Sequence, residues 1–402
     1  MARVFETGMQ ATATRFGGLG RWANDGRVRG WLAQIACVAV VAAIGWFFAA
    51  NANSNLARNA AAFGFGFLTE RTGIEVSFSL IEYSASSSYA RLLLVGLLNT
   101  FFVSIFAILL AALIGVAVGI GRLSRNWLLA ALSTAYVELI RNIPLLLFVL
   151  ACYFAALYAL PGPRESLSLA GAVFLNNRGL FLPAPLSAGL LWGVPVVATI
   201  GAAAALVFGR WSSARQDRTG RALPSATIGA GLVVAPTALM LLAAIATTAW
   251  ELPALRGFNL RGGVSVIPEF VALLAALSLY TGAFIAEIVR GGLLAVPDGQ
   301  RQAAAALGLS RGQILRLVII PQALRVMIPP LTSQFVNVVK NSSYAAAIAY
   351  PEIVSVFVGS ALNNTGRAIE IIAITMAIYL AINLVVSVFM NWFNARMAIV
   401  VR

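Results

Sequence analysis

The stretch Val296–Pro330 reads VPDGQRQAAAALGLSRGQILRLVIIPQALRVMIPP, a polar, arginine-bearing interruption between two long apolar runs. Asp298 follows Pro297, which cannot continue a helix from upstream, and is therefore predicted to be a helix N-cap. Gln300–Leu307 consists of strong helix formers, and Gly308 stands where a left-handed residue is expected to end the helix. A first short helix is thus predicted, with small alanines along it.

A second helix is predicted to begin at Ser310, because Gln313 three residues later completes a capping box. Pro321 is expected to disrupt this helix after about three turns. Together the two helices predict a bent helix–turn–helix that could enter a groove on another protein. The alternative is a connecting loop of a multispan protein, in which the alanines only favour helix.

The composition is that of a membrane protein. Hydrophobic residues make up 60% of the 402 residues and charged residues only 10%, and the mean hydropathy is +0.88. Soluble domains are roughly 45–50% apolar and 25% charged. The net charge of +14 would suggest nucleic acid for a soluble protein, but the arginines lie beside apolar runs, so we expect no nucleic-acid partner and a lipid environment instead.

The residues for a metal or haem site are missing from the sequence. It has no histidine, and its two cysteines, Cys37 and Cys152, both lie in apolar runs. We expect them to behave as small buried hydrophobes, with no disulfide, metal site or cofactor.

The apolar runs predict an all-α, polytopic fold with about eight transmembrane helices. A run of about 20 apolar residues can cross a bilayer. The approximate limits of the runs are 31–50, 92–120, 127–160, 186–208, 226–250, 266–289, 326–348 and 371–393. The third run is interrupted by Glu138, Arg141 and Pro144, and the segments 161–185 and 349–370 are predicted to be loops.

The distribution of Lys and Arg predicts the orientation. If the N-terminus is cytoplasmic, 18 of the 28 Lys and Arg residues lie on the cytoplasmic side and 8 on the other side, while Arg141 and Lys340 lie within spans. Positive residues concentrate on the cytoplasmic side of membrane proteins. Both termini and the segment 290–325 are therefore predicted to be cytoplasmic.

The motif GQRQAAAALGLS followed by IIPQALR resembles the "EAA loop" of permease subunits of bacterial ATP-binding-cassette importers, in the polar amino-acid uptake branch (histidine/glutamine permease-like). In that family the loop docks into a cleft of the cytoplasmic ATPase. The positions that carry this resemblance, and its implied coupling role, are Gln302, Ala303, Ala304, Gly308 and Pro321. Gln302 stands where the family usually has Glu, which leaves one charged contact in question.

The resemblance extends over roughly residues 92–160 and 264–393, with GLLNT at 96–100, YVELIRNIPLL at 136–146 and PPLTSQFVNVVKNSS at 329–343. It implies a five-helix type I importer (MetI-like) core. Residues 1–91 would then be a cytoplasmic tail, an extra span and a periplasmic loop, and 161–263 an inserted loop with two spans. Residues 264–402 would complete the core and carry the coupling loop 290–325. A chain of this plan is similar to a membrane subunit of the general L-amino-acid importers.

The implied partners are a second homologous permease subunit, two cytoplasmic ATPase subunits and a periplasmic amino-acid-binding protein. ATP hydrolysis is assigned to the partners, because a Walker loop needs Gly-Lys-Ser/Thr and the only lysine follows Val339. The chain itself is therefore not expected to be an enzyme. The alternatives are an ion-gradient-driven amino-acid transporter, although we find no clear repeat of the sort typical of such transporters, and a membrane enzyme, for which no nucleophile–base pairing is present.

Polar residues within apolar spans are costly and become candidates for the translocation path. The candidates are Asn99, Thr100, Glu138, Arg141, Lys340, Asn341 and Ser343. Each has an alternative role. Glu138 and Arg141, three residues apart, could form a structural ion pair. Lys340 could snorkel to the surface instead of meeting a substrate carboxylate, and Asn99 and Thr100 could join helices by hydrogen bonds.

Overall fold

The long apolar runs form long helices in the computed structural model, which describes residues 26–58, 64–187, 189–220 and 223–397. Residues 1–25 of the predicted cytoplasmic tail and residues 398–402 lie outside this description. The chain divides into two units, residues 1–66 and residues 67–402, and each is described by itself.

Most of the described part of the first unit is the helix α2 (Gly26–Arg58). Its segment Gly30–Phe48 is long and apolar enough to cross a membrane, and none of it is buried against protein. Its large apolar side chains, such as Trp46 at 78% exposure, face outward. An apolar helix with no buried face is suited to lipid on all sides, which agrees with the first predicted span.

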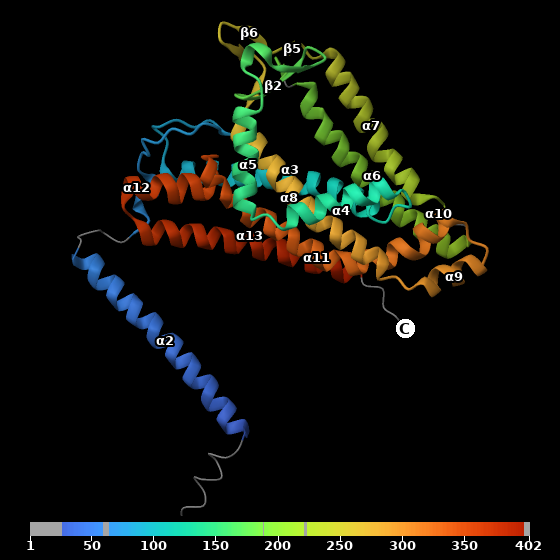
Figure 1. Cartoon of the computed structure of the whole chain (residues 1–402), viewed down its shortest axis with the longest axis horizontal. Coiled ribbons are helices and arrows are strands. Elements are labelled where there is room, and N and C mark those ends of the chain that lie inside the picture. Colours follow the sequence, from blue (N-terminus) through green and yellow to red (C-terminus); the bar gives the residue numbers. More distant parts are fainter. Residues whose placement is uncertain (1–25, 59–63, 188, 221–222, 398–402) are drawn as a thin grey trace, which may run out of the picture. The chain divides into compact units, whose positions relative to one another are not determined.

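The second unit is built from the following elements in chain order (Figure 1). The helices and helical turns are η1 (Gly66–Thr69), α3 (Tyr89–Gly121), α4 (Trp127–Arg141), α5 (Leu145–Tyr158), η2 (Pro163–Glu165), η3 (Leu190–Trp192), α6 (Gly193–Thr219), α7 (Ser225–Thr247), α8 (Pro268–Leu294), α9 (Asp298–Ala306), α10 (Arg311–Ile314), η4 (Leu315–Ile319), α11 (Ile320–Asn341), η5 (Ser342–Ile348), η6 (Val354–Ala361), α12 (Leu362–Thr365) and α13 (Ala368–Met397). The strands are β1 (Leu167–Leu169), β2 (Val173–Asn176), β3 (Gly179–Leu182), β4 (Ala184–Pro185), β5 (Trp250–Glu251), β6 (Ala254–Arg256), β7 (Asn259–Arg261) and β8 (Val264–Val266).

The mostly helical architecture confirms the predicted fold class. Within the described residues of both units, seven helices qualify as membrane spans, or eight if the bent pair α4 and α5 counts as one span. These two helices meet at 109°, so the third predicted span is sharply broken rather than merely interrupted. Pro144 is the residue before α5 and has an extended ψ of 131°. Because proline has no backbone N–H, it cannot donate a hydrogen bond that would continue α4.

The core depends on the close approach of α3 to α8. A Cβ atom added at Gly115 would lie 2.4 Å from Ile285 Cγ2, and one added at Gly119 would lie 2.7 Å from the carbonyl oxygen of Ala286. No side chain fits at these distances, so glycine allows the two backbones to come together. A Cβ atom added at Gly282 on α8 would likewise lie 2.9 Å from Ile114 Cγ2 on α3. This helix pair is therefore the centre of the second unit.

The predicted loop 349–370 is largely helical and partly buried, which corrects the sequence-based expectation. After η5 the chain turns at Tyr350 and Glu352, both fully buried, and continues as the π-helical segment η6. The Tyr350 hydroxyl donates to the backbone carbonyl of Asn99 at 3.1 Å, which ties this segment to α3. An apolar segment between two spans can fold back into the protein when its polar groups find partners there.

The predicted loop 161–185 is also different in the structure, because it joins residues 250–266 in small antiparallel sheets. The larger sheet has the order β1-β2-β3-β8, and β4–β5 and β6–β7 form two further pairs. Asn177 and Arg178 form a two-residue hairpin between β2 and β3, with Phe174 opposite Phe181. Figure 1 shows these strands gathered at the outer ends of α5, α6 and α7. Residues 161–263 thus contain a β-structured cap as well as the predicted two helices.

A single carboxylate, Glu287 near the end of α8, holds three helices together. It forms ion pairs with Arg122 at the end of α3, with Arg290 at 2.5 Å, and with Arg141 at the end of α4 at 3.8 Å. Arg141 also lies 5.2 Å from the ring centroid of Phe284. We call Arg122, Arg141, Glu287 and Arg290 the Glu287 cluster.

The predicted pair between Glu138 and Arg141 is wrong. Glu138 is exposed, and Arg141 pairs with Glu287 instead. A spacing of three residues permits a pair on a helix, but the broken end of α4 turns Arg141 toward α8, where an acidic partner and an aromatic ring are both available.

We predict that Glu287→Gln destabilises the purified protein and that Glu138→Gln does not. Removing the shared carboxylate leaves three guanidinium groups close together, and loss of partly exposed charged hydrogen bonds costs about 1–3 kcal/mol. The thermal unfolding midpoint in detergent should fall by several degrees for Glu287→Gln and change by about one degree or less for Glu138→Gln. Equal midpoints for the two variants would show that the cluster does not stabilise the fold.

Candidate functional site

The sequence motif at Val296–Pro330 forms a compact turn of two helices, which we call the elbow (residues 298–314). Its first helix starts at Asp298, which is the first helical residue and not the N-cap; Pro297 occupies the cap position with an extended ψ of 139°. Asp298 instead pairs with Arg301 at 3.2 Å on the exposed surface. The predicted helix is therefore correct, but the capping role of Asp298 is wrong because its side chain turns toward the next turn of the helix.

The turn between the two helices follows the sequence prediction. Gly308 has a φ of +78°, and the amides of Gly308 and Leu309 donate to the carbonyls of Ala305 and Ala304. This pair of bonds is a Schellman motif, which favours glycine at the left-handed position. Ser310 then forms the predicted capping box with Gln313, so local hydrogen bonds fix the angle of the elbow.

Pro321 does not end the second helix of the elbow, which corrects the prediction. The helix passes from α10 into the π-helical segment η4 and then directly into α11, whose first turn contains Pro321. A π-helical turn absorbs the change in hydrogen bonding that a proline imposes. The elbow is therefore joined without a break to the membrane helix α11.

The two faces of α9 differ. Ala304 is 4% exposed and points inward, whereas Gln302 and Ala303 are exposed. Leu307 at the tip is 81% exposed, a fraction that only Tyr158 equals among the exposed large apolar residues of the described chain. The outer face thus presents small residues and one prominent leucine.

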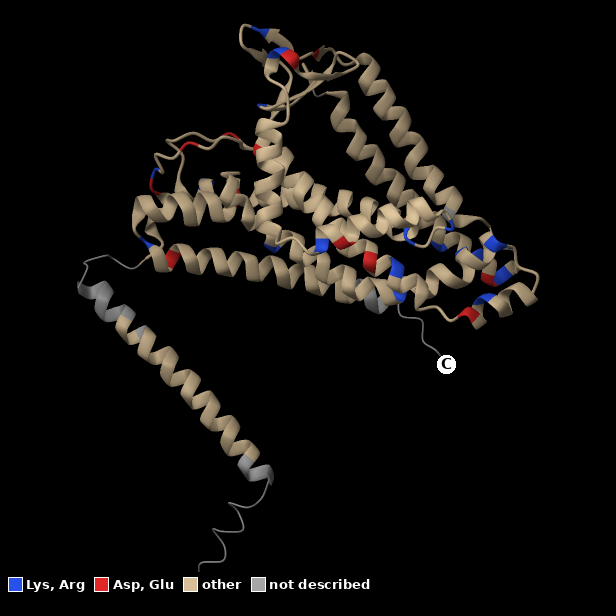
Figure 2. Cartoon of the chain, in the orientation of Figure 1, with Lys and Arg blue, Asp and Glu red and all other residues tan. Residues whose placement is uncertain are grey.

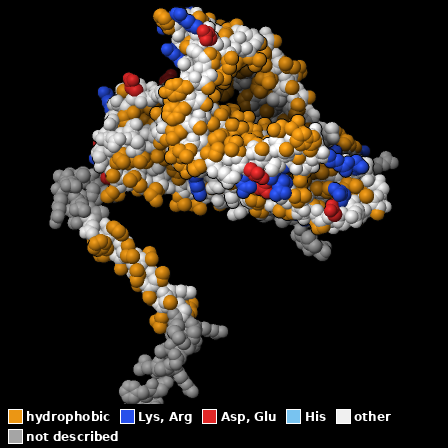
Figure 3. Space-filling view, viewed as in Figure 1, with side chains coloured by type: hydrophobic (Ala, Val, Ile, Leu, Met, Phe, Trp, Pro, Cys, Tyr) orange, Lys and Arg blue, Asp and Glu red, His pale blue; other side chains and the backbone are white. Residues whose placement is uncertain are grey.

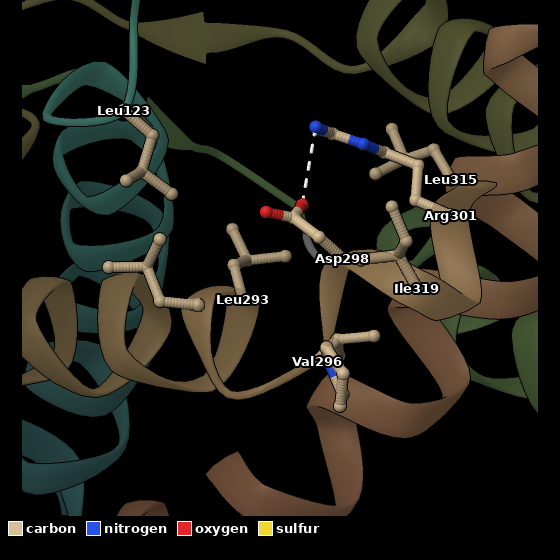
Figure 4. A pocket seen from close by; sticks show the side chains of 9 residues that line it. Leu123, Leu293, Val296, Asp298, Arg301, Leu315 and Ile319 are labelled. Atoms are coloured by element: carbon tan, nitrogen blue, oxygen red, sulfur yellow. Dashed lines mark ion pairs between the residues drawn. The ribbon is translucent and has the colours of Figure 1, made fainter.

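A cavity of about 440 Å³ lies between the elbow and the membrane helices. Figure 4 shows side chains from several elements around it, among them Leu123 after α3, Leu293 near the end of α8, and Ile319 in η4. The Asp298–Arg301 ion pair lies at its edge. Apolar side chains of the core and of η4 line this space, together with the charged side chains of Asp298 and Arg301 from the elbow. Within α9 only Ala304 is buried, so the outer face of this helix remains open.

A second cavity, of about 450 Å³, lies between the end of α11 and α13, and we call it the lysine cavity. It is lined by Lys340, Ser343, Val354, Thr375, Met376, Tyr379, Leu380 and Asn383. Oδ1 of Asn383 is buried and has no hydrogen-bond partner among the described residues. Lys340 and Asn383 therefore line the same space, while Oδ1 of Asn383 itself is buried.

The other predicted path residues have different positions. Asn99 and Thr100 are fully buried. The side-chain amide of Asn99 donates to the backbone carbonyls of Phe78 and Pro351. The Thr100 hydroxyl accepts a hydrogen bond from the backbone N–H of Ile353. Neither residue lines the lysine cavity, and Asn341 is half-buried beside it. Glu138 is exposed and Arg141 belongs to the Glu287 cluster. Of the predicted path residues, only Lys340 and Ser343 line the lysine cavity.

Sequence analysis missed Glu352, which is fully buried. Its carboxylate accepts from the amides of Val354 at 2.9 Å and Ser355 at 2.7 Å and from the Tyr379 hydroxyl at 3.1 Å. Burial raises the pKa of the Glu352 carboxyl to about 7, although these three donors lower it. The carboxylate connects the start of η6 to the wall of the lysine cavity. In the sequence, the feature that could have identified Glu352 is its position as an acidic residue directly after Pro351 in an otherwise apolar segment.

Comparison with known proteins places the chain among membrane subunits of importers. Residues 199–399 match the family model "Binding-protein-dependent transport system inner membrane component". The chain is 46% identical over 378 residues to the general L-amino acid transport system permease protein AapQ of Rhizobium johnstonii, which covers 94% of each chain. It is 49% identical over 377 residues to the putative amino-acid ABC transporter permease protein YhdX of Escherichia coli, covering 93% of this chain and 95% of the relative.

Among solved structures, an amino acid ABC transporter with histidines aligns with 77% of this chain and 95% of its own, at 20% identity and a TM-score of 0.46. The family match and the two relatives confirm the sequence-based resemblance. The chain belongs to the family of binding-protein-dependent transport system inner membrane components.

Proposed function

We propose that this protein is one permease subunit of an ATP-driven importer of L-amino acids. It forms the translocation path with a second, homologous permease subunit. Two cytoplasmic ATPase subunits bind the elbows of the two permease subunits, and a periplasmic binding protein delivers the amino acid. The amino-acid assignment rests on the names of the two relatives. Family membership favours this function over the ion-gradient-driven alternative.

The observation that carries the proposal is the one-sided support of α9. Its inner face packs at Ala304, while Gln302, Ala303 and Leu307 remain exposed. Small side chains allow a partner surface to approach the helix backbone, and an exposed leucine can fill an apolar pocket and contribute about 1.5–3 kcal/mol on burial. This geometry supports the role of Gln302, Ala303, Ala304 and Gly308 as the coupling loop.

The charge pattern supports a cytoplasmic position for the elbow. Figure 2 shows Lys and Arg gathered around the end of the second unit that carries α9 and α10. Positive residues favour the cytoplasmic side, where ATP is hydrolysed. Rotation of the ATPase subunits would then move the elbow, and α8 and α11 with it, in a rigid-body alternation of access.

The lysine cavity is proposed as part of the path for the substrate. Every α-amino acid carries a carboxylate, and the Lys340 ammonium can pair with it. Asn383 lines the same cavity. Ser343 lies on the same wall and adds a hydroxyl group.

We predict that Leu307→Asp weakens binding of the ATPase subunits by about 10–100-fold, because a charged residue replaces the leucine that a partner pocket would bury. The measurement is copurification of the ATPase with the tagged permease from native membranes. Leu169→Asp is the matched control, since Leu169 is 72% exposed in the β-structured cap, and it should leave the ATPase bound. Normal copurification with Leu307→Asp would contradict the coupling role of the elbow.

A second prediction separates transport from assembly. Lys340→Gln should lower ATP-dependent uptake of radiolabelled L-amino acids in proteoliposomes of the full complex by about 10–100-fold, because it removes one charged hydrogen bond to the carboxylate. Lys340→Arg should retain a measurable part of the uptake. Both variants should copurify the ATPase normally. Unchanged uptake by Lys340→Gln would exclude the lysine cavity from the path.

A further inference from the structure

The end of α6 carries a basic surface that the proposed transport function does not use. Trp211, Arg215 and Arg218 are spaced by four and three residues and therefore share one helix face. Together with Ala214 and Thr219 they line a cavity of about 320 Å³. The guanidinium of Arg215 lies 5.4 Å from the ring centroid of Trp211. The indole therefore forms one wall of the cavity next to a positive charge.

The two arginines have no counter-ion among the described residues. No ion pair to Arg215 or Arg218 is present within the described part of the chain, and both side chains are exposed. Asp217 lies two residues from Arg215 and one from Arg218, so it does not share their face. Two guanidinium groups beside one cavity are well suited to a phosphate, because each can donate two parallel hydrogen bonds.

The same helix face continues into apolar residues. Val207, one turn before Trp211, is 66% exposed, and Ile200, two turns earlier, is 63% exposed. Figure 3 shows hydrophobic side chains over much of the molecular surface, with charged residues grouped beside them. Trp favours the boundary between hydrocarbon and headgroups. An occupant of this face must therefore be apolar along Ile200 and Val207 and negatively charged at the arginines.

The α6–α7 hairpin is also open to lipid. α6 and α7 pack mainly against each other and against η3, and a Cβ atom added at Gly201 would lie 2.6 Å from the carbonyl oxygen of Leu232. Their other faces expose residues such as Leu206 and Leu239, each 70% exposed. A soluble acidic protein could reach the arginines but has no reason to cover the apolar face next to them.

We propose that Trp211, Ala214, Arg215 and Arg218 form a binding site for the phosphate headgroup of an anionic phospholipid, whose acyl chains lie along Val207 and Ile200. The guanidinium groups bind the phosphate, and Trp211 packs against the glycerol region. Basic pockets beside membrane helices bind such headgroups through charge and hydrogen bonds. The site would anchor the inserted hairpin to the membrane around it.

The test compares the full-length protein with Arg215→Gln/Arg218→Gln, purified in mild detergent from the same membranes. Binding of phosphatidylglycerol is then measured by native mass spectrometry, with phosphatidylcholine as the neutral lipid. We expect the affinity of the double variant for phosphatidylglycerol to be about 30-fold lower, which corresponds to a loss of about five- to sixfold for each arginine. Weak phosphatidylcholine binding should not change.

The matched control is Arg256→Gln/Arg261→Gln, which removes the same charge from β6 and β7 in the β-structured cap. It should bind phosphatidylglycerol as the wild type does. Arg215→Lys/Arg218→Lys should retain most of the binding, which shows that the site is folded. Equal phosphatidylglycerol affinity of the wild type and the Gln double variant, with both proteins folded, would overturn the proposal.

Two further outcomes would also overturn it. If excess inorganic phosphate displaces phosphatidylglycerol completely, the site binds a free anion and the acyl chains contribute nothing. If the Gln double variant loses a copurifying acidic protein while its lipid binding stays unchanged, the surface is a protein interface. Binding that tolerates excess phosphate and depends on both arginines supports the lipid site.

Discussion

The close approach of α3 and α8 is the constraint on which the rest of the second unit depends. Gly115 and Gly119 bring the two backbones so close that a Cβ atom at either position would collide with α8. In lipid, apolar surfaces gain little by meeting each other, so close packing of backbones and buried polar contacts supply much of the attraction between helices. This approach carries the end of α3 to the end of α8, where Arg122 and Glu287 meet.

The Glu287 cluster extends this packing to the elbow. Glu287 binds arginines from the ends of α3, α4 and α8, and α8 ends four residues before α9 begins. On its other side the elbow continues through η4 into α11. The elbow is thus attached at both ends to membrane helices and has little freedom to move alone. Under the proposed function, this attachment converts a movement of the ATPase into a movement of α8 and α11.

Much of this arrangement could be predicted from the sequence because it depends on local rules. Spans follow from length and hydropathy, since a lipid-exposed segment must satisfy its backbone within itself. The Gly308 turn and the Ser310 capping box follow from hydrogen bonds between near neighbours in the chain. The resemblance to importer permeases rested on this same motif and was confirmed by the comparisons.

The errors concern choices made by tertiary structure. Glu138 was considered as the partner of Arg141 because it lies three residues away, but Arg141 pairs with Glu287 on α8, a contact between helices that the sequence spacing does not reveal. Pro321 was expected to end a helix, but a π-helical turn absorbs it. The buried segment around Glu352 resembled a loop because its polar groups find their partners only after folding. The short strands of the cap pair across the whole α6–α7 hairpin, so no local pattern revealed the pairing of β3 with β8.

The central claim is that the elbow faces the cytoplasm, where the ATPase subunits can bind it. The most direct measurement uses a variant in which the native Cys37 and Cys152 are replaced by serine and Arg311→Cys supplies the single cysteine. Intact spheroplasts and inverted membrane vesicles that contain this variant are treated with a membrane-impermeant maleimide. Arg311 is exposed at the start of α10, so the label can reach it from its own side. The account predicts labelling in inverted vesicles only. Labelling in intact spheroplasts would put the elbow on the opposite side of the membrane from ATP and contradict the account.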